Sequence, residues 1–182
     1  VIERMVALME QAARERATLV VFPELALTSF FPRWAIDDEA ELDGFYETSM
    51  PGPDIEPLFA AARELRLGLS FGYGELAGQP GRRQRFNSAI LVGPDGSIRA
   101  RYRKVHLFDV AVDDGPVDLE SARVAGGSEP VVADVDGLAL GLSICYDLRF
   151  PELYRTLALA GAEVLAVPSN FTERTGRDHW EV

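Results

Sequence analysis

The sequence predicts an α/β fold, because stretches with helical periodicity alternate with strand-like apolar runs and two hairpins interrupt the alternation. Residues 2–16 and 54–66 carry apolar side chains at steps of three and four, which is typical of amphipathic helices. Residues 18–22 and 162–167 are short, continuous apolar runs, as expected for strands buried on both faces. Together these patterns indicate a sandwich of mixed β-sheets.

The two hairpins are predicted from their turn residues. Their strands are 86–92 and 98–104 around Gly93-Pro-Asp-Gly96, and 131–135 and 138–144 around Asp136-Gly137. The other expected elements are a short helix at 38–46, a strand at 67–75, a helix at 151–161, and loops at 77–85 and 108–127. Asp54 is expected to cap the helix that starts there, and Gly161 to end the helix that Pro151 begins.

The composition is that of a globular domain. The 182 residues are 47% hydrophobic and 26% charged, and no apolar stretch is long enough for a transmembrane helix. The formal net charge of −11 argues against nucleic acids and anionic membranes as partners, since both require a basic surface. The single cysteine excludes an internal disulfide, so a cytoplasmic protein is expected.

Both ends of the sequence fall at or inside expected elements. The chain begins at Val1, directly before the first helix, and it ends at Val182, where another helix is expected to start. We therefore expect one domain over residues 1–182 that is a fragment of a longer protein.

Three reactive side chains stand at the ends of expected strands. Cys145 precedes a turn into a helix, where free amides and the helix dipole favour a thiolate nucleophile. Glu24 directly follows a buried strand and is a candidate general base, and Lys104 ends another strand and is a candidate for stabilising an oxyanion. The alternatives are a buried structural cysteine, a carboxylate satisfied at a loop start and a solvated lysine. Because open α/β folds bind ligands at the carboxyl ends of strands, the three residues are expected to form one site.

The sequence resembles the nitrilase, or carbon–nitrogen hydrolase, superfamily in three stretches that occur in the family's order: VVFPELALT, YRKVHLFD and ICYDLRFPELYR. The resemblance covers essentially the whole chain. It implies an α-β-β-α sandwich that is incomplete at both ends here, without the family's first strand and its C-terminal part. It also implies a homo-oligomer and a reaction that needs no metal or organic cofactor. The lack of a Cys/His cluster agrees, since the only histidines are His106 and His179.

Matched position by position, the resemblance implies that Glu24 is the general base, Lys104 the oxyanion stabiliser and Cys145 the nucleophile. Glu120 matches the family's second active-site glutamate, which helps to position substrate and water; the alternative is one more acid in an acidic loop. The implied reaction hydrolyses an amide or carbamoyl C–N bond through a thioester, with the backbone N–H of Tyr146 as the second oxyanion donor. A catalytically inactive binding module is the alternative class, and the intact triad argues against it.

The two halves of the chain resemble different branches of the family. The segments PELALTSFFPRW and RRQRFNSAILVGPDGSI are similar to N-carbamoyl-D-amino-acid amidohydrolases. The segments HLFDVAVDDG and ESARVAGG are similar to Nit-type amidases, which include ω-amidases and deaminated-glutathione amidases. We therefore expect a small carboxylate-bearing substrate. An N-carbamoyl amino acid is the main interpretation, and an ω-amide or deaminated glutathione is the alternative.

Four residues are candidates for binding that substrate. Arg149 suits a carboxylate because a planar guanidinium binds it through two hydrogen bonds, and a salt bridge with Glu152 or Asp147 is the alternative. The other candidates for the pocket wall are Tyr146, Asn170 and His106. A hydrogen-bonded core position is the alternative for the histidine. The aromatic cluster Phe30, Phe31 and Trp34 is expected in the core or in a subunit contact more than in the pocket.

Overall fold

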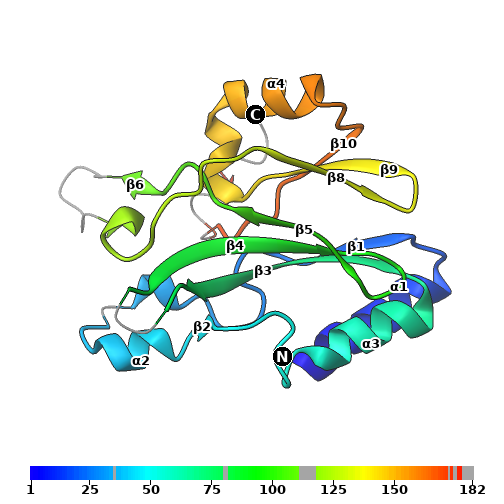
Figure 1. Ribbon diagram of the computed structural model, residues 1–182, viewed down its shortest axis with the longest axis horizontal. Helices are drawn as coiled ribbons and strands as arrows, with labels where there is room; N and C mark the ends of the chain where they lie inside the picture. Colours follow the sequence, from blue (N-terminus) through cyan, green and yellow to red (C-terminus); the bar gives the residue numbers. More distant parts are fainter. Residues whose placement is uncertain (35, 80–81, 111–117, 172, 174–175, 178–182) are drawn as a thin grey trace.

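Figure 1 shows two β-sheets stacked face to face, with helices on the outer side of each sheet. The computed structural model describes residues 1–182 apart from 35, 80–81, 111–117, 172, 174–175 and 178–182. The helices are α1 (Ile2–Arg14), α2 (Glu39–Asp43), α3 (Glu56–Leu65) and α4 (Pro151–Leu159), with 3₁₀ turns η1 (Phe31–Arg33), η2 (Glu120–Ala122) and η3 (Cys145–Arg149). The strands are β1 (Leu19–Val21), β2 (Tyr46–Glu47), β3 (Gly68–Ala77), β4 (Gln84–Val92), β5 (Ile98–Arg103), β6 (Asp109–Val110), β7 (Asp118–Leu119), β8 (Val131–Val135), β9 (Leu138–Leu142) and β10 (Val164–Ala166).

Both larger sheets are mixed. The first follows the order β1-β3-β4-β5, with β2 also paired to β3. Strands β1 and β2 run parallel to β3, whereas β4 is antiparallel to both β3 and β5. The second sheet has the order β10-β9-β8, with β10 parallel and β8 antiparallel to β9, and β6 pairs with β7 in a small separate sheet. The predicted α/β sandwich of mixed sheets is confirmed.

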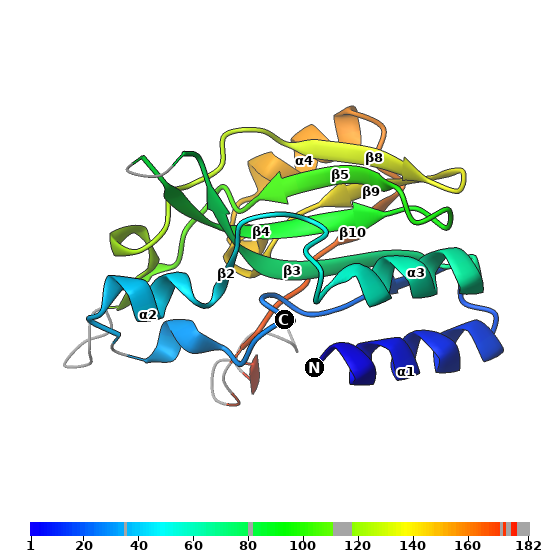
Figure 2. The ribbon, with the colours of Figure 1, turned by 60° about the horizontal axis from the view of Figure 1, so that its bottom comes forward.

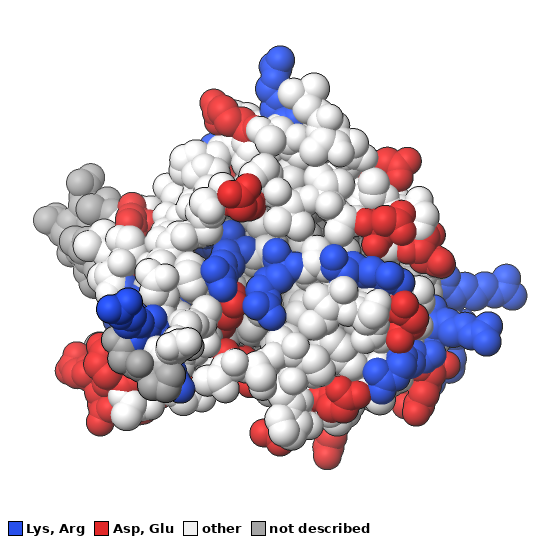
Figure 3. All heavy atoms as spheres, in the orientation of Figure 1, with Lys and Arg blue, Asp and Glu red and all other residues white. Residues whose placement is uncertain are grey.

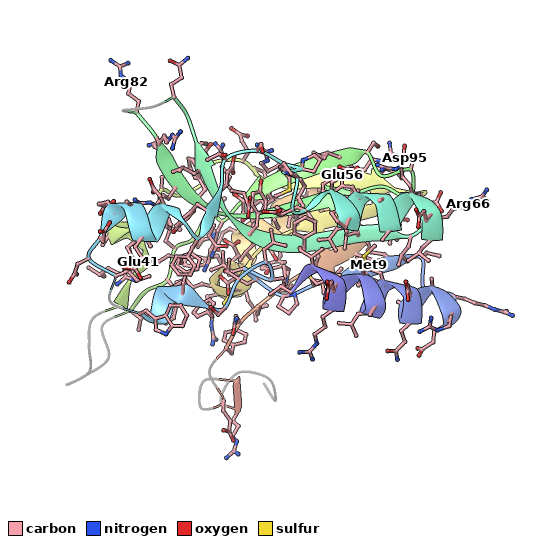
Figure 4. All side chains as sticks on the ribbon, turned by 90° about the horizontal axis from the view of Figure 1, so that it is seen from below. Met9, Glu41, Glu56, Arg66, Arg82 and Asp95 are labelled. Carbon is pink, nitrogen blue, oxygen red and sulfur yellow. The ribbon has the colours of Figure 1, made fainter. Side chains whose placement is uncertain are left out.

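Helices α1 and α3 lie side by side against the outer face of the first sheet (Figure 2). The apolar stripe of α1 faces inward. The buried side chain of Met9 belongs to this stripe and to the apolar cluster that α1 forms with α3 and the first sheet (Figure 4). A second apolar cluster fills the space between the sheets, and its fully buried members include Leu91, Tyr102, Leu140 and Ile144. Helix α4 covers the second sheet from outside, with Leu157 buried. The active-site candidates thus lie where the two sheets meet.

Three predicted helices have different boundaries in the structure. The helix expected at 38–46 ends at Asp43, because Tyr46 pairs with β3 as part of β2. Helix α1 ends at Arg14, and Arg16 already adopts a left-handed conformation with φ 64°. Helix α3 starts at Glu56, and Asp54 does not cap it. The reason is local. The N–H groups of Ile55 and Glu56 both donate to the Gly52 carbonyl, so this backbone oxygen of the preceding turn satisfies them in place of a side-chain cap.

Two predicted loops contain more structure than expected. The strands β3 and β4 extend until Ala77 pairs with Gln84, so the loop expected at 77–85 is shorter. In the loop expected at 108–127, Asp109 pairs with Leu119. Both differences come from cross-strand pairing, which local composition does not encode. The two hairpin turns are confirmed: Gly96 has φ 74°, and both residues of the second turn have positive φ.

Charge is distributed unevenly over the surface. Three arginines alternate along β5, and Figure 3 shows basic side chains in a row across the middle of one face. Arg101 and Arg103 of β5 both pair with Glu75, whose side chain is buried. No helix within the described residues is long and apolar enough to cross a bilayer.

The close approach of β3 to the chain after β1 makes Gly72 a critical position. A Cβ at Gly72 would lie 2.6 Å from the Leu25 nitrogen and 2.8 Å from the Glu24 Cα, both backbone atoms that cannot rotate away. We expect Gly72→Ala to destabilise the protein by about 1–3 kcal/mol in urea denaturation. Gly52→Ala is the matched control, because Gly52 has no left-handed φ and its Cβ position has nothing closer than 3.6 Å. A loss at Gly72 no larger than at Gly52 would contradict this.

Candidate active site

Glu24 enters the site just beyond β1. The chain continues alongside β3 past the end of the strand, since the Ala26 N–H donates to the Gly72 carbonyl at 2.8 Å. It then bends sharply, with Leu25 in the left-handed region at φ 50°. The Glu24 residue is only 2% exposed. A carboxylate buried to this degree requires hydrogen-bond or charge partners.

Lys104 supplies the first partner. Its backbone N–H donates to the Asn87 carbonyl at 2.8 Å, which places it one residue past β5 and beside β4. Its Nζ donates to Glu24 Oε1 at 3.0 Å and to Glu120 Oε2 at 2.9 Å. The side chain is 2% exposed, so the predicted alternative of a solvated lysine does not apply.

Glu120 is therefore part of the same cluster. The side chain of Asn87 on β4 reinforces it, because its Nδ2 donates to Glu24 Oε1 at 2.8 Å and to Glu120 Oε1 at 2.9 Å. The Phe108 N–H donates to Glu120 Oε2 at 2.7 Å. Two carboxylates are thus held together by one ammonium and one amide group.

This arrangement keeps the lysine charged. Burial by itself lowers the pKa of Lys104, but the negative charges of Glu24 and Glu120 act in the opposite direction and raise its pKa above the usual value. The cluster of these three side chains then carries one net negative charge. A buried ammonium fixed in this way is suited to stabilise an anion that forms next to it.

Cys145 lies at the turn between β9 and α4. It opens η3 in a left-handed conformation with φ 48°, which is costly for a residue with a side chain. Its N–H donates to the Pro168 carbonyl at 3.0 Å, and this bond ties the turn to the segment after β10. Strained backbone of this kind is often found at functional sites because the surrounding structure must hold it there.

The expectation that this position favours a thiolate is wrong for the resting protein. Burial, together with the nearby charge of Glu24, raises the pKa of Cys145 to about 12, although Lys104 and the Asn170 N–H act in the opposite direction. The turn η3 spans five residues only, so it contributes little dipole. A thiol whose pKa is raised in this way becomes a nucleophile by passing its proton to a base, and the Glu24 carboxylate is close enough to influence that pKa.

Asp147 organises the turn around the cysteine. It is fully buried, and its carboxylate accepts hydrogen bonds from Ile144 N–H at 2.8 Å and from Tyr102 Oη at 2.7 Å. It also accepts from the N–H of His106 at 3.0 Å and contacts His106 Nδ1 at 2.8 Å. The Asp147 carboxylate thus fixes Ile144, which directly precedes Cys145, and His106, which lies two residues after Lys104.

A cavity of about 500 Å³ opens onto these groups. Glu24, Lys104, Glu120 and Cys145 form its polar floor. Its walls are mostly apolar and include Leu25, Phe30, Phe31, Phe86, Phe108, Val124 and Phe171. A small molecule with a polar reacting group and an apolar body fits such a site.

Three of the four substrate-binding candidates line this cavity: Tyr146, Arg149 and Asn170. Arg149 is exposed, and among the described residues it pairs with neither Glu152 nor Asp147. His106 is placed differently. Its ring is hydrogen-bonded to Asp147 and stacked on Phe150 with centroids 3.7 Å apart, which matches the alternative of a core histidine.

The aromatic cluster has two environments. Phe31 is buried and stacks on Phe45, so it belongs to the core as expected. Phe30 and Phe31 also line the cavity, which the sequence analysis did not expect. Trp34 is partly exposed and packs near Phe45. Phe30 and Phe31 follow Glu24 by only six and seven positions. The short turn η1 lets the chain fold back so that both side chains line the same cavity as Glu24.

The sequence analysis overlooked Asn87 and considered Asp147 only as a salt-bridge partner. Asn87 had a signal, because it is one of two polar residues, with Ser88, in the otherwise apolar run 86–92. Its partners are 63 and 33 positions away in the sequence, so the run alone does not reveal them. Within the described residues, no cluster of three or more His, Cys, Asp and Glu side chains is arranged to hold a metal ion.

The chain belongs to the carbon–nitrogen hydrolase family, whose model matches residues 1–182. It is 54% identical over 109 residues to a deaminated glutathione amidase from Synechocystis, a match that covers 59% of this chain and 39% of that protein. It is 33% identical over 179 residues to a chloroplastic omega-amidase from Arabidopsis thaliana, covering 95% of this chain and 45% of the relative.

The fold agrees with this assignment. The crystal structure of Nit3 from Saccharomyces cerevisiae, a member of branch 10 of the nitrilase superfamily, matches with a TM-score of 0.79 and 27% identity. That match covers 100% of this chain and 62% of Nit3. The chain therefore spans between about two fifths and three fifths of the length of these relatives. The nitrilase-superfamily membership predicted from the three sequence stretches is confirmed.

The raised pKa of Cys145 predicts a slow and strongly pH-dependent reaction with iodoacetamide. The rate should keep rising above pH 9, whereas the same thiol in urea-unfolded chain should level off near its ordinary pKa of 9.0. Glu24→Gln removes the nearby negative charge, so its alkylation should be faster than wild type at equal pH. A plateau below pH 9 in the folded wild type would contradict the burial argument.

Asp147 should be needed for the geometry of the cysteine turn. In Asp147→Asn an N–H₂ group replaces one acceptor oxygen and faces the donors around it. We expect a loss of about 1–3 kcal/mol in the free energy of unfolding, measured in urea. Glu152→Gln, an exposed change five residues further on, is the control and should be neutral within about 0.5 kcal/mol.

Proposed function

We propose that the protein hydrolyses the amide bond of a small carboxylate-bearing compound through a thioester on Cys145. The observation that carries the proposal is the convergence of Glu24, Lys104 and Cys145, with Glu120, on the floor of one cavity. These groups supply a base, a cation and a nucleophile, which are the components that acyl transfer requires.

In the first half of the reaction, Glu24 accepts the proton of the Cys145 thiol as the sulfur attacks the carbonyl carbon. The C–S bond forms and the carbonyl oxygen becomes an oxyanion. Lys104 Nζ and the N–H of Tyr146 donate to it; the latter lies in the first turn of η3, where N–H groups lack a partner within the helix. The protonated Glu24 then gives its proton to the leaving nitrogen, and the C–N bond breaks.

In the second half, water replaces the released amine. Glu24, again a carboxylate, takes a proton from the water as its oxygen attacks the thioester carbon. The same two donors hold the second oxyanion, and its collapse breaks the C–S bond and returns the proton from Glu24 to sulfur. Glu120 positions Lys104 for both steps through its 2.9 Å hydrogen bond. The net charge of the buried groups is the same at the start and the end of the cycle.

The choice between amide and carbamoyl substrates favours the amide. The sequence analysis took N-carbamoyl amino acids as the main interpretation. The relatives named above are a deaminated glutathione amidase and an omega-amidase, which support the alternative. Arg149, exposed on the cavity rim without a carboxylate partner among the described residues, is proposed to bind the substrate carboxylate. Tyr146 and Asn170 line the path to it.

Ammonia release from succinamate, N-carbamoyl-D-alanine and butanamide tests this proposal. We expect turnover of succinamate and at least tenfold lower kcat/KM for the other two, because butanamide lacks the carboxylate and the carbamoyl compound presents a different acyl group. Preference for N-carbamoyl-D-alanine would return the assignment to the carbamoylase branch. No ammonia from any of the three would favour the non-catalytic alternative.

The Cys145→Ala and Glu24→Gln variants assign the chemistry. Cys145→Ala should abolish turnover, and Glu24→Gln should lower kcat by about 10²–10⁴-fold. Both variants should keep the wild-type circular dichroism spectrum, because neither enlarges a side chain. Residual turnover in folded Cys145→Ala would falsify the thioester mechanism.

A further inference from the structure

Arg123 is the one cavity-lining arginine that the sequence analysis did not consider. It directly follows η2, and its N–H donates to the Glu120 carbonyl at 3.0 Å. The short turn that brings Glu120 to Lys104 therefore also brings Arg123 to the cavity wall.

Part of the guanidinium has a structural task. Its Nη1 donates to the carbonyl oxygens of Pro32 at 2.9 Å and of Trp34 at 3.0 Å. These oxygens belong to the segment around η1, which contributes Phe30 and Phe31 to the wall. Through these two hydrogen bonds, Arg123 connects the turn η2 to the segment that forms the aromatic wall.

Within the described residues, the hydrogen bonds of the Arg123 side chain involve Nη1 alone. An arginine has five N–H groups, and the two on Nη1 are used by the two carbonyls. The remaining edge, formed by Nε and Nη2, is the planar fork that binds a carboxylate through two parallel hydrogen bonds. Within the part of the chain that the structure describes, no Asp or Glu pairs with Arg123.

The neighbouring arginine shows the contrast. Arg85, whose guanidinium lies near the same Tyr46 ring, is neutralised by Glu39 and Asp43. Arg123 is half-buried and lines the cavity near Tyr46, and within the described residues no ion pair includes it. A cation in this environment is unfavourable unless an anion joins it, and the cavity is where an anion can enter.

We propose that Arg123 is a specificity-determining residue whose free Nε–Nη2 edge binds the carboxylate of the substrate, while Nη1 holds the aromatic wall. The proposal rests on the amidase function above and adds to it a carboxylate position in the wall. This position should contribute more than the exposed Arg149, because a half-buried ion pair is screened less by solvent and salt.

The test compares Arg123→Met and Arg149→Met on succinamate and on butanamide, which are similar in size and differ in charge. Arg123→Met should raise KM for succinamate about ten- to a hundredfold, and it should raise KM for butanamide by a clearly smaller factor, because the lost Nη1 hydrogen bonds to the wall affect both amides whereas the lost ion pair affects succinamate alone. Arg149→Met should have the smaller effect on succinamate. Arg155→Met, an exposed change on α4, should leave both values unchanged.

Two results would overturn the proposal. An equal rise for both amides would mean that Arg123 only supports the wall, and an unchanged KM for succinamate would mean that it does not bind the carboxylate. A binding measurement separates this from failure of the proposed function. Cys145→Ala chain should bind succinate by calorimetry, and Arg123→Met in that background should weaken binding at least tenfold even if the wild type turns over no amide.

Discussion

The ammonium of Lys104 between the carboxylates of Glu24 and Glu120 is the interaction on which the rest of the structure depends. Burying three charges is costly, and the attraction of the ammonium for both carboxylates offsets that cost. Removal of Lys104 would leave two like charges next to each other in the interior. The cluster therefore joins the segments after β1 and β5 to the turn η2.

Another buried carboxylate, at the end of the second sheet, must also be compensated by its neighbours. Asp147 is a buried carboxylate that accepts hydrogen bonds from Tyr102 and His106 around the end of β5 and from Ile144 after β9. It connects the strained turn at Cys145 to the chain just beyond Lys104. The two sheets of the sandwich are thus joined by a polar network at the site as well as by the apolar cluster between them. A network of this kind fixes the relative position of nucleophile and cation more narrowly than apolar contacts do.

Electrostatics also separates two groups of residues in the site: Cys145 and Glu24, which exchange a proton in the proposed reaction, and the arginines that line the cavity. A buried thiol next to a carboxylate holds its proton, so nucleophilicity is produced only when a substrate is ready to accept the electron pair. In the proposed reaction, the proton moves between Cys145 and Glu24 without a change in their combined charge. Arg123 and Arg149 line the same cavity, and we propose that they bind the part of the substrate that does not react. Chemistry and selection would then be carried by different residues.

The sequence by itself determined the alternation of helices and strands, both hairpin turns and the strand-end positions of Glu24, Lys104 and Cys145. These depend on local periodicity, turn residues and family motifs. Only the tertiary structure decided the bridging role of Asn87, the burial of Asp147, the position of Arg123 in the cavity wall and the raised pKa of the Cys145 thiol. Each of these depends on partners far away in the chain, 146 positions apart in the hydrogen bond from the Asn170 N–H to Glu24. Distance along the chain hides such pairs, because burial and charge interactions act through space.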